Sequence, residues 1–162
     1  MTNNEPNTAI ATDAREIARQ AEVELAILLS VKQSLRFAIQ LMTRGRGNCH
    51  KLSTLRFALA TFERHLIRTR ILSDHGGYMH ATTDVNPHLA NKVKTLKAKR
   101  KKIDSTLERL ILQLECMSPM DDDALKCACK ELEHYLEQLE LHAQKEMALF
   151  QHSFVQEEGG EG

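Results

Sequence analysis

The sequence contains few residues that interrupt helices, with only 3 prolines and 7 glycines among 162 residues. It also has no net charge, because 22 lysine and arginine residues balance 22 aspartate and glutamate residues. A zero total argues against a protein that coats nucleic acid or an anionic membrane with its whole surface. It is compatible with a local charged patch, so the distribution of charge along the chain decides more than its sum.

Long apolar runs and a secretory leader are also lacking. No run approaches the roughly 20 apolar residues that span a bilayer, and residues 1–12 show no charged segment followed by an apolar one. We therefore expect a cytoplasmic protein that makes no membrane contact. Four cysteines in such a chain indicate thiols rather than a disulfide framework. With 42% hydrophobic residues, the chain is expected to fold as one domain around a core.

The few helix breakers divide the chain into four long segments. Helices are expected at about residues 13–43, 49–74, 86–117 and 118–155. Asp13 and Glu16 form a capping-box pattern at the first start. The third and fourth helices each start at a capping residue followed by proline, Asn86 and Ser118 being the capping residues.

Apolar residues recur at spacings of three and four in each segment, which is the period of a helix and not of a strand. Four helices of similar length with short connections pack most simply as an all-α, up-down-up-down four-helix bundle. We assign this bundle to residues 13–155. Residues 1–12 and the acidic, glycine-rich residues 156–162 are expected to be disordered.

Polar residues interrupt these apolar stripes at mid-length. They are Lys32, His65, Thr69, Arg100, His142 and Glu146. His142 and Glu146 stand four apart, so both lie on one face of the last helix, and His65 and Thr69 repeat that spacing on the second. In a bundle of alternating direction all these positions converge at a similar level. Convergent histidine and carboxylate side chains are how helical bundles build di-metal sites.

The sequence resembles the hemerythrin-like, cation-binding HHE family over about residues 28–150. The segments that carry the resemblance are 28–41, 62–66, 96–103 and 139–150. The resemblance implies a hemerythrin-like bundle in which half of the family's iron ligands remain. These are His65, His142 and Glu146. The other ligand positions hold Lys32, Thr69 and Arg100.

These substitutions favour a bundle that has kept a buried polar layer and exchanged its metal for internal ion pairs. A di-iron centre supplies positive charge that stabilises ionised carboxylates. Lys32 and Arg100 would supply that charge instead, with Glu146 paired to either cation, so we expect no cofactor. Two alternatives remain. One is a residual or altered site for iron, as a di-iron centre, or for another divalent metal, and the other is ordinary flanking residues whose long stems snorkel to water.

The alternating topology places all the cysteines at one end of the bundle. They are Cys49, Cys116, Cys127 and Cys129. Thiolates there are competent zinc or iron–sulfur ligands, but residues two apart on a helix point in nearly opposite directions. We favour Cys129 as a small core residue and Cys116 or Cys127 as partly exposed thiols over a metal site. A redox-sensing pair of Cys49 with Cys116 is a further alternative.

Basic residues and histidines collect at the opposite end. The basic patch comprises Arg64, Arg68, Lys92, Lys94, Lys97, Lys99, Lys101 and Lys102. The histidines there are His75, His80, His88 and His152. A basic patch can hold an acidic protein partner or nucleic acid. A solvated helix face neutralised by its neighbours is the commoner explanation, because the patch lacks the aromatic residues that stack on bases.

No arrangement of nucleophile and base and no glycine-rich phosphate loop stands out, so nothing in the sequence supports an enzyme. The first interpretation is a non-catalytic regulatory or protein-interaction module. The alternatives are a metal-binding hemerythrin-like protein that handles dioxygen, nitric oxide or iron, and a nucleic-acid-associated protein. Apolar residues beside the main stripes predict a homodimer. They are Ile27, Leu29, Phe37, Ile39, Leu41 and Ile111.

Overall fold

A computed structural model describes residues 6–45, 49–75 and 87–158 of the chain. The described residues form helices and turns and contain no strand. The long helices are α1 (Pro6–Thr43), α2 (Cys49–His75), α4 (Ala90–Cys116) and α5 (Asp122–Glu158), and a short 3-10 helix, η1 (Pro87–Leu89), precedes α4. The prediction of an all-α fold built from four long helices is therefore confirmed within the described ranges.

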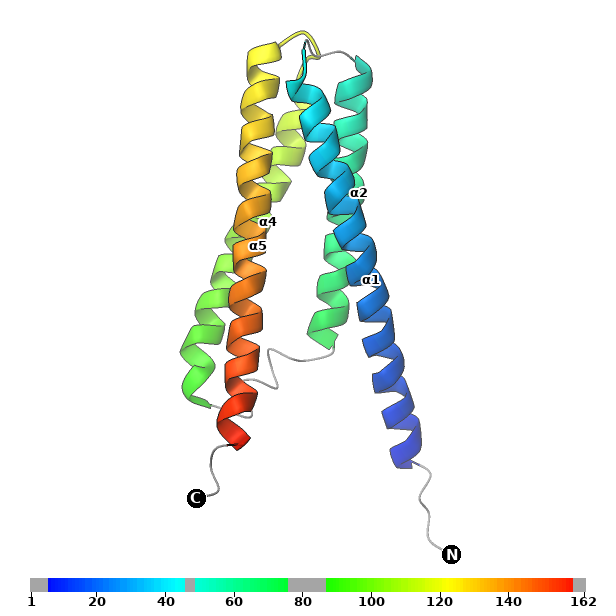
Figure 1. The fold of residues 1–162 in the computed structure, drawn as a ribbon, viewed down its shortest axis with the longest axis vertical. Helices are drawn as coiled ribbons and strands as arrows, with labels where there is room; N and C mark the ends of the chain where they lie inside the picture. Colours follow the sequence, from blue (N-terminus) through cyan, green and yellow to red (C-terminus); the bar gives the residue numbers. More distant parts are fainter. Residues whose placement is uncertain (1–5, 46–48, 76–86, 159–162) are drawn as a thin grey trace, which may run out of the picture.

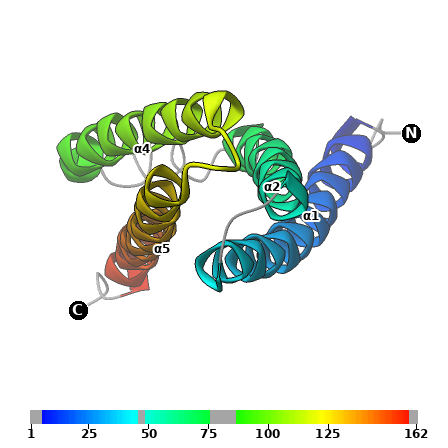
Figure 2. The ribbon, with the colours of Figure 1, turned by 90° about the horizontal axis from the view of Figure 1, so that it is seen from above.

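The long helices form two antiparallel pairs, α1 with α2 and α4 with α5 (Figure 1). The pairs contact each other through α1 with α5 and through α2 with α4. They lie close together at the upper end of Figure 1 and separate toward the lower end, where both termini lie. Figure 2, which looks down on the upper end, also shows α1 beside α2 and α4 beside α5.

Some helix boundaries differ from those the sequence indicates. α1 begins at Pro6, ahead of Asp13, so residues 6–12 continue the helix instead of forming a disordered end. Proline fits the first helical position because its nitrogen has no hydrogen to leave unpaired. At the other end of the chain, α5 extends to Glu158 and includes residues that the sequence assigned to the tail. Residues 1–5, 46–47, 76–77, 80, 86 and 159–162, for which the sequence also makes predictions, lie outside the described residues.

Helix α5 begins later than the sequence indicates. Its N-cap is Asp121, whose Oδ1 accepts a hydrogen bond of 3.1 Å from the Ala124 backbone N–H. Ser118 instead closes the preceding turn, where its hydroxyl oxygen accepts a hydrogen bond of 3.2 Å from the Met120 N–H. At the end of α1, Gly45 has a φ of 76°, a left-handed conformation that glycine adopts without steric cost.

The main core lies toward the end where the two pairs meet. Its largest fully buried side chains are Leu35, Ile39, Leu52, Leu55, Leu59, Phe62, Leu110, Leu114, Leu132, Tyr135 and Leu136. Phe62 of α2 and Tyr135 of α5 join the pairs through an edge-to-face ring contact with centroids 6.4 Å apart. A second cluster contains only Leu89, Val93 and Leu149 with Leu96 beside them, all from η1, α4 and α5. Among the described residues, the separated ends of the pairs therefore do not share one core.

Two positions in this core correct the sequence analysis. Ile39, which was expected beside the apolar stripe and available to a dimer, is fully buried. On α2 the buried face runs through Leu59, Phe62 and Leu66, so His65 lies beside this face and not on it. Positions 65 and 66 are adjacent on a helix with 3.6 residues per turn, so their side chains point about 100° apart around the helix axis.

One stretch of α1, Arg19–Thr43, is long and apolar enough to cross a membrane by length and composition alone. This finding corrects the expectation that no such run exists among the residues now described. In the fold, Leu28, Leu35, Ile39 and Met42 of this stretch pack into the main core. Only 22% of the stretch is buried; a single helix of this kind is weak evidence for membrane insertion, because core helices of folded domains and signal sequences pass the same test.

Candidate functional site

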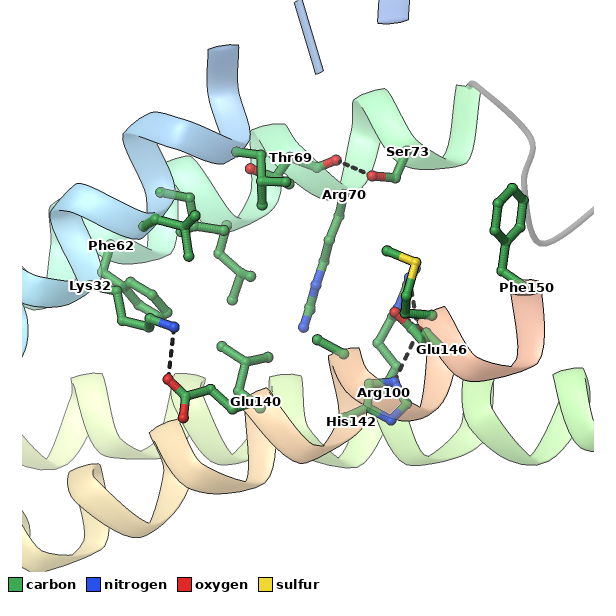
Figure 3. A pocket seen from close by; sticks show the side chains of 17 residues that line it. Lys32, Phe62, Thr69, Arg70, Ser73, Arg100, Glu140, His142, Glu146 and Phe150 are labelled. Carbon is green, nitrogen blue, oxygen red and sulfur yellow. Dashed lines mark hydrogen bonds and ion pairs between the residues drawn. The ribbon is translucent and has the colours of Figure 1, made fainter. Parts of the chain in front are cut away.

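A cavity of about 440 Å³ lies between the two helix pairs, and we call it the interhelical cavity (Figure 3). Residues from α1, α2, α4 and α5 line it. Its apolar wall consists of Leu25, Leu28, Leu29, Phe62, Leu66, Leu139, Ala143, Met147 and Phe150. Its polar wall consists of Lys32, Thr69, Arg70, Ser73, Arg100, Glu140, His142 and Glu146. The volume falls within the range of about 300–1,000 Å³ that is usual for small-molecule sites.

One ion pair of the polar wall joins α4 to α5. Arg100 approaches Oε1 of Glu146 with Nε at 3.1 Å and Nη2 at 3.0 Å. The side chains of these two residues are only 15% and 12% exposed. Arg100 also reaches α2, because its Nη1 donates to Oδ1 of Asp74 at 3.1 Å. One guanidinium therefore links three helices at the edge of the interhelical cavity.

His142 is the most buried polar residue of this wall, with 2% of its side chain exposed. Its Nε2 lies 3.0 Å from Oε1 of Glu146, but neither ring nitrogen makes an aligned hydrogen bond to another described residue. Burial lowers the pKa of His142, Arg100 and Arg70 lower it further, and Glu146 opposes them. The imidazole is therefore neutral at pH 7.

Arg70 extends from α2 across the interhelical cavity toward α5 (Figure 3). Its guanidinium pairs with the carboxylate of Asp104 on α4. Burial is the main cause that lowers the pKa of Arg70, and the nearby charge of Arg100 adds to it. The site thus holds a guanidinium that has lost much of its hydration.

Lys32 forms a different ion pair from the expected one. Its Nζ donates to Oε1 of Glu140 on α5 at 2.7 Å, and Arg36 donates to the same oxygen at 2.9 Å. The hydrogen bond from Lys32 is the main cause that lowers the pKa of Glu140. Of the two cations that the sequence offers to Glu146, Arg100 is the one in contact with it, and Lys32 contacts Glu140 instead. Lys32 lies on α1, and the carboxylate that it contacts comes about 1.7 helical turns before Glu146.

The remaining positions of the predicted polar layer do not complete a metal site. His65 does not line the interhelical cavity, and its Nδ1 contacts the Glu24 carboxylate of α1 at 2.5 Å. Thr69 lines the cavity but donates its hydroxyl hydrogen to the His65 carbonyl at 2.8 Å.

The donor set of this layer does not fit a di-iron cofactor. His142 and Glu146 lie together, His65 points elsewhere, and cations line the cavity where further ligands would be needed. A metal ion would have to displace Arg100 from Glu146 and would face the charges of Arg70 and Lys32. Within the described part of the chain, no group of histidine, cysteine and carboxylate residues has the arrangement of a metal site.

The cysteines divide into two environments. Cys129 is buried in the main core, and burial raises the pKa of its thiol to about 11. Cys49, Cys116 and Cys127 are exposed on the ends of α2, α4 and α5 that lie together at the top of Figure 1. The described cysteines are all thiols and form no disulfide.

The basic patch lies on the surfaces of α2 and α4. Its members are exposed except Lys99, which is partly buried. Two of them, Lys99 and Lys102, also line a groove of about 510 Å³ between α4 and α5, which we call the basic groove. Arg109 and Lys130 add to its positive charge, while Glu131 pairs with Arg109 at 2.7 Å. Of the histidines that the sequence places at this end, His88 and His152 are exposed. The structure does not describe the side chain of His75 or any part of His80.

Several residues of the site, Arg70 and Glu140 among them, are not among the candidates predicted from the sequence. A signal for Arg70 was present, since it follows Leu59 and Leu66 at helical spacing on the buried face of α2. No comparable pattern marks Glu24 or Asp104, whose partners come from other helices.

A scan of family models and searches of curated proteins and solved structures found no match to this chain.

Proposed function

We propose that the chain is a divergent, hemerythrin-like, up-down-up-down bundle that acts as a cytoplasmic, non-catalytic protein-interaction module. In this proposal internal ion pairs occupy the level at which relatives would bind iron. The observation that supports it most is the placement of Arg100, whose guanidinium is in contact with Glu146 beside the buried His142. An arginine in that position neutralises the carboxylate that a metal would need.

The outer face of the α1–α2 pair supports the interaction part of the proposal. Phe37 and Phe57 are 59% and 73% exposed and line an uncharged groove of about 520 Å³ between these helices. The other residues of the groove are Val31, Gln33, Ser34, Ala38, Thr54, Ala58 and Thr61. Exposed apolar side chains that gather on one face mark sites where proteins associate. A second copy of the chain or a different protein would bury them.

The metal-binding alternative can be tested directly by stability. A metal that binds only the folded chain raises its midpoint of thermal unfolding. We expect iron(II), added without oxygen, and manganese(II) to leave that midpoint unchanged in the wild-type protein. A rise that is lost in Glu146→Gln and kept in Glu137→Gln, which changes an exposed carboxylate of the same helix, would favour a metal-binding protein over the proposal.

The basic groove favours a nucleic-acid-associated protein as the second candidate. Lys99, Lys102, Arg109 and Lys130 would each neutralise a backbone phosphate, and only Glu131 among the groove residues opposes them. Binding of this kind weakens steeply as salt is added, because counterions are released from the nucleic acid. Fluorescence anisotropy of a labelled oligonucleotide at two salt concentrations tests it. Absence of salt-sensitive binding removes this candidate and leaves the protein-interaction proposal.

A further inference from the structure

The interhelical cavity has one apolar wall and one polar, charged wall, and this combination suits an amphiphilic ligand. Leu25 and Leu29 of α1 and Met147 of α5 line it while remaining about half exposed. Half-exposed apolar side chains on facing helices gain from a hydrocarbon placed between them, since the hydrophobic effect scales with the apolar area removed from water. The separation of the helix pairs below the main core provides the space.

The charged side chains of the cavity differ in how many oppositely charged partners they contact. Glu140 receives hydrogen bonds from Lys32 and Arg36, and it thus has two cationic partners for one carboxylate. Arg70, in contrast, crosses the cavity with one carboxylate in direct contact, that of Asp104, while Glu146 and Asp74 act on it electrostatically and burial lowers its pKa. A guanidinium carries five N–H donors, and a single carboxylate accepts hydrogen bonds from only some of these donors. The environment of Arg70 therefore accommodates a further anionic oxygen.

His142 provides a second, independent observation in the same wall. Its side chain is almost completely buried and lines the cavity, and while its Nε2 lies 3.0 Å from Oε1 of Glu146, its Nδ1 has no hydrogen-bond partner among the described residues. A buried polar atom without a partner costs free energy that a ligand or an ordered water recovers. The polar group of a ligand at Arg70 would lie in the wall that contains this imidazole.

We propose that the interhelical cavity binds an aliphatic monocarboxylate, with its carboxylate at Arg70 beside His142 and its hydrocarbon chain between Leu25, Leu29 and Met147. The carboxylate accepts charge-assisted hydrogen bonds from the guanidinium, which are stronger than those between neutral groups. The apolar wall excludes a sugar or a nucleotide, whose many hydroxyl and phosphate groups would have too few partners there. A cationic amphiphile is disfavoured because its head would meet Arg70.

Titration calorimetry with dodecanoate and dodecyltrimethylammonium below their micelle concentrations, and with dodecanol below its solubility limit, tests the proposal. Dodecanoate should bind with one molecule per chain, and the alcohol and the cation should bind at least about tenfold more weakly, which corresponds to one charge-assisted hydrogen bond. Arg70→Met should weaken dodecanoate binding by about the same factor. The control Arg64→Met changes an exposed arginine of the same helix and should leave the affinity unchanged.

Ala143→Phe keeps Arg70 in place and fills part of the cavity, so it decides the case if Arg70→Met does not fold. It should abolish saturable binding of dodecanoate. The proposal is overturned if dodecanoate does not bind, if it binds no better than dodecanol, or if the folded Ala143→Phe variant keeps the wild-type affinity. These outcomes are independent of the proposed interaction function, which metal addition and association measurements test separately.

Discussion

Arg100 on α4 and Glu146 on α5 form a largely buried ion pair, with Nη2 3.0 Å from Oε1. Near this pair, α4 and α5 also meet through the small apolar cluster that contains Val93, Leu96 and Leu149. Replacing a buried pair by apolar residues is often neutral, while removing one partner leaves a desolvated charge. Substitution of Arg100 alone or Glu146 alone should therefore cost more stability than replacement of both residues together.

Removal of one partner of this pair should be costly. We expect Glu146→Gln or Arg100→Met to lower the free energy of unfolding by about 2–4 kcal/mol, because either change leaves the other charge poorly compensated. The double variant Arg100→Met/Glu146→Leu should recover a large part of that loss. Urea unfolding followed by circular dichroism measures all three. Arg109→Met breaks the exposed pair with Glu131 and should cost about 0–1 kcal/mol; equal losses at both pairs would contradict a special role for Arg100 and Glu146.

Stability should fall as the solution becomes mildly acidic. The lowered pKa of His142 means that the unfolded chain binds a proton at a pH where the folded chain does not. The free energy of unfolding therefore decreases as the pH is lowered through about 6.5, the ordinary pKa of histidine. His142→Leu should reduce this slope, whereas His134→Leu, at an exposed position of the same helix, should not. Urea midpoints at several pH values between neutral and mildly acidic measure the effect, and a slope unchanged by His142→Leu would contradict the assignment.

The hydroxyl of Tyr135 is buried and has no hydrogen-bond partner among the described residues. Burial raises the pKa of this phenol, so the group stays protonated. Because Tyr135→Phe removes an unsatisfied polar atom and keeps the ring contact with Phe62, we expect it to be neutral or to stabilise the fold by up to about 1 kcal/mol. A loss of stability in urea unfolding would show that the hydroxyl has a partner in solution.

The cysteines should react in two classes. Cys49, Cys116 and Cys127 are exposed and should react with a thiol reagent in the folded protein, while Cys129 should react only after unfolding. Its burial and its raised pKa of about 11 both act against formation of the thiolate, which is the reactive species. Counting the reactive thiols with and without denaturant measures this, and Cys129→Ala should remove only the slow class. Mild oxidation that consumes two of the exposed thiols together would instead support the Cys49–Cys116 redox pair.

The outer face of the α1–α2 pair should mediate self-association. We expect a dimer in sedimentation velocity, because Phe37 and Phe57 present an uncharged apolar groove that association would cover. Phe37→Glu with Phe57→Glu should give a monomer. Leu112→Glu changes a similarly exposed apolar residue on α4 and should leave the dimer intact. A wild-type chain that sediments as a monomer would contradict the homodimer and leave the face for another protein.

Local sequence signals predicted the helices well, and they predicted the contacts between helices less well. The breakers around residues 44–47 and the Ser118–Pro119 pair located the connections to within a few residues, because connections depend on backbone preferences of a few adjacent residues, although the N-cap of α5 is Asp121 and not Ser118. They could not determine that Lys32 faces Glu140 or that His65 faces Glu24. Those contacts depend on how far each helix is rotated and shifted against its neighbour, and one residue of error in rotation moves a side chain by about 100°.

The polar layer illustrates the same limit. Apolar spacing on α4 and α5 was sufficient to bring Arg100 and Glu146 to the same interface. Arg70 was overlooked because an arginine at the end of a helix is usually solvated, and only the tertiary arrangement of α2 against α4 and α5 turns it into the cavity.

Elemental analysis of the natively purified protein is the most direct test of the central claim, that Glu146 is engaged by Arg100 in place of a metal. The account predicts iron and manganese far below one atom per chain, with a content unaffected by Glu146→Gln. Stoichiometric iron or manganese that disappears in Glu146→Gln and in His142→Leu, while both variants remain folded, would contradict it.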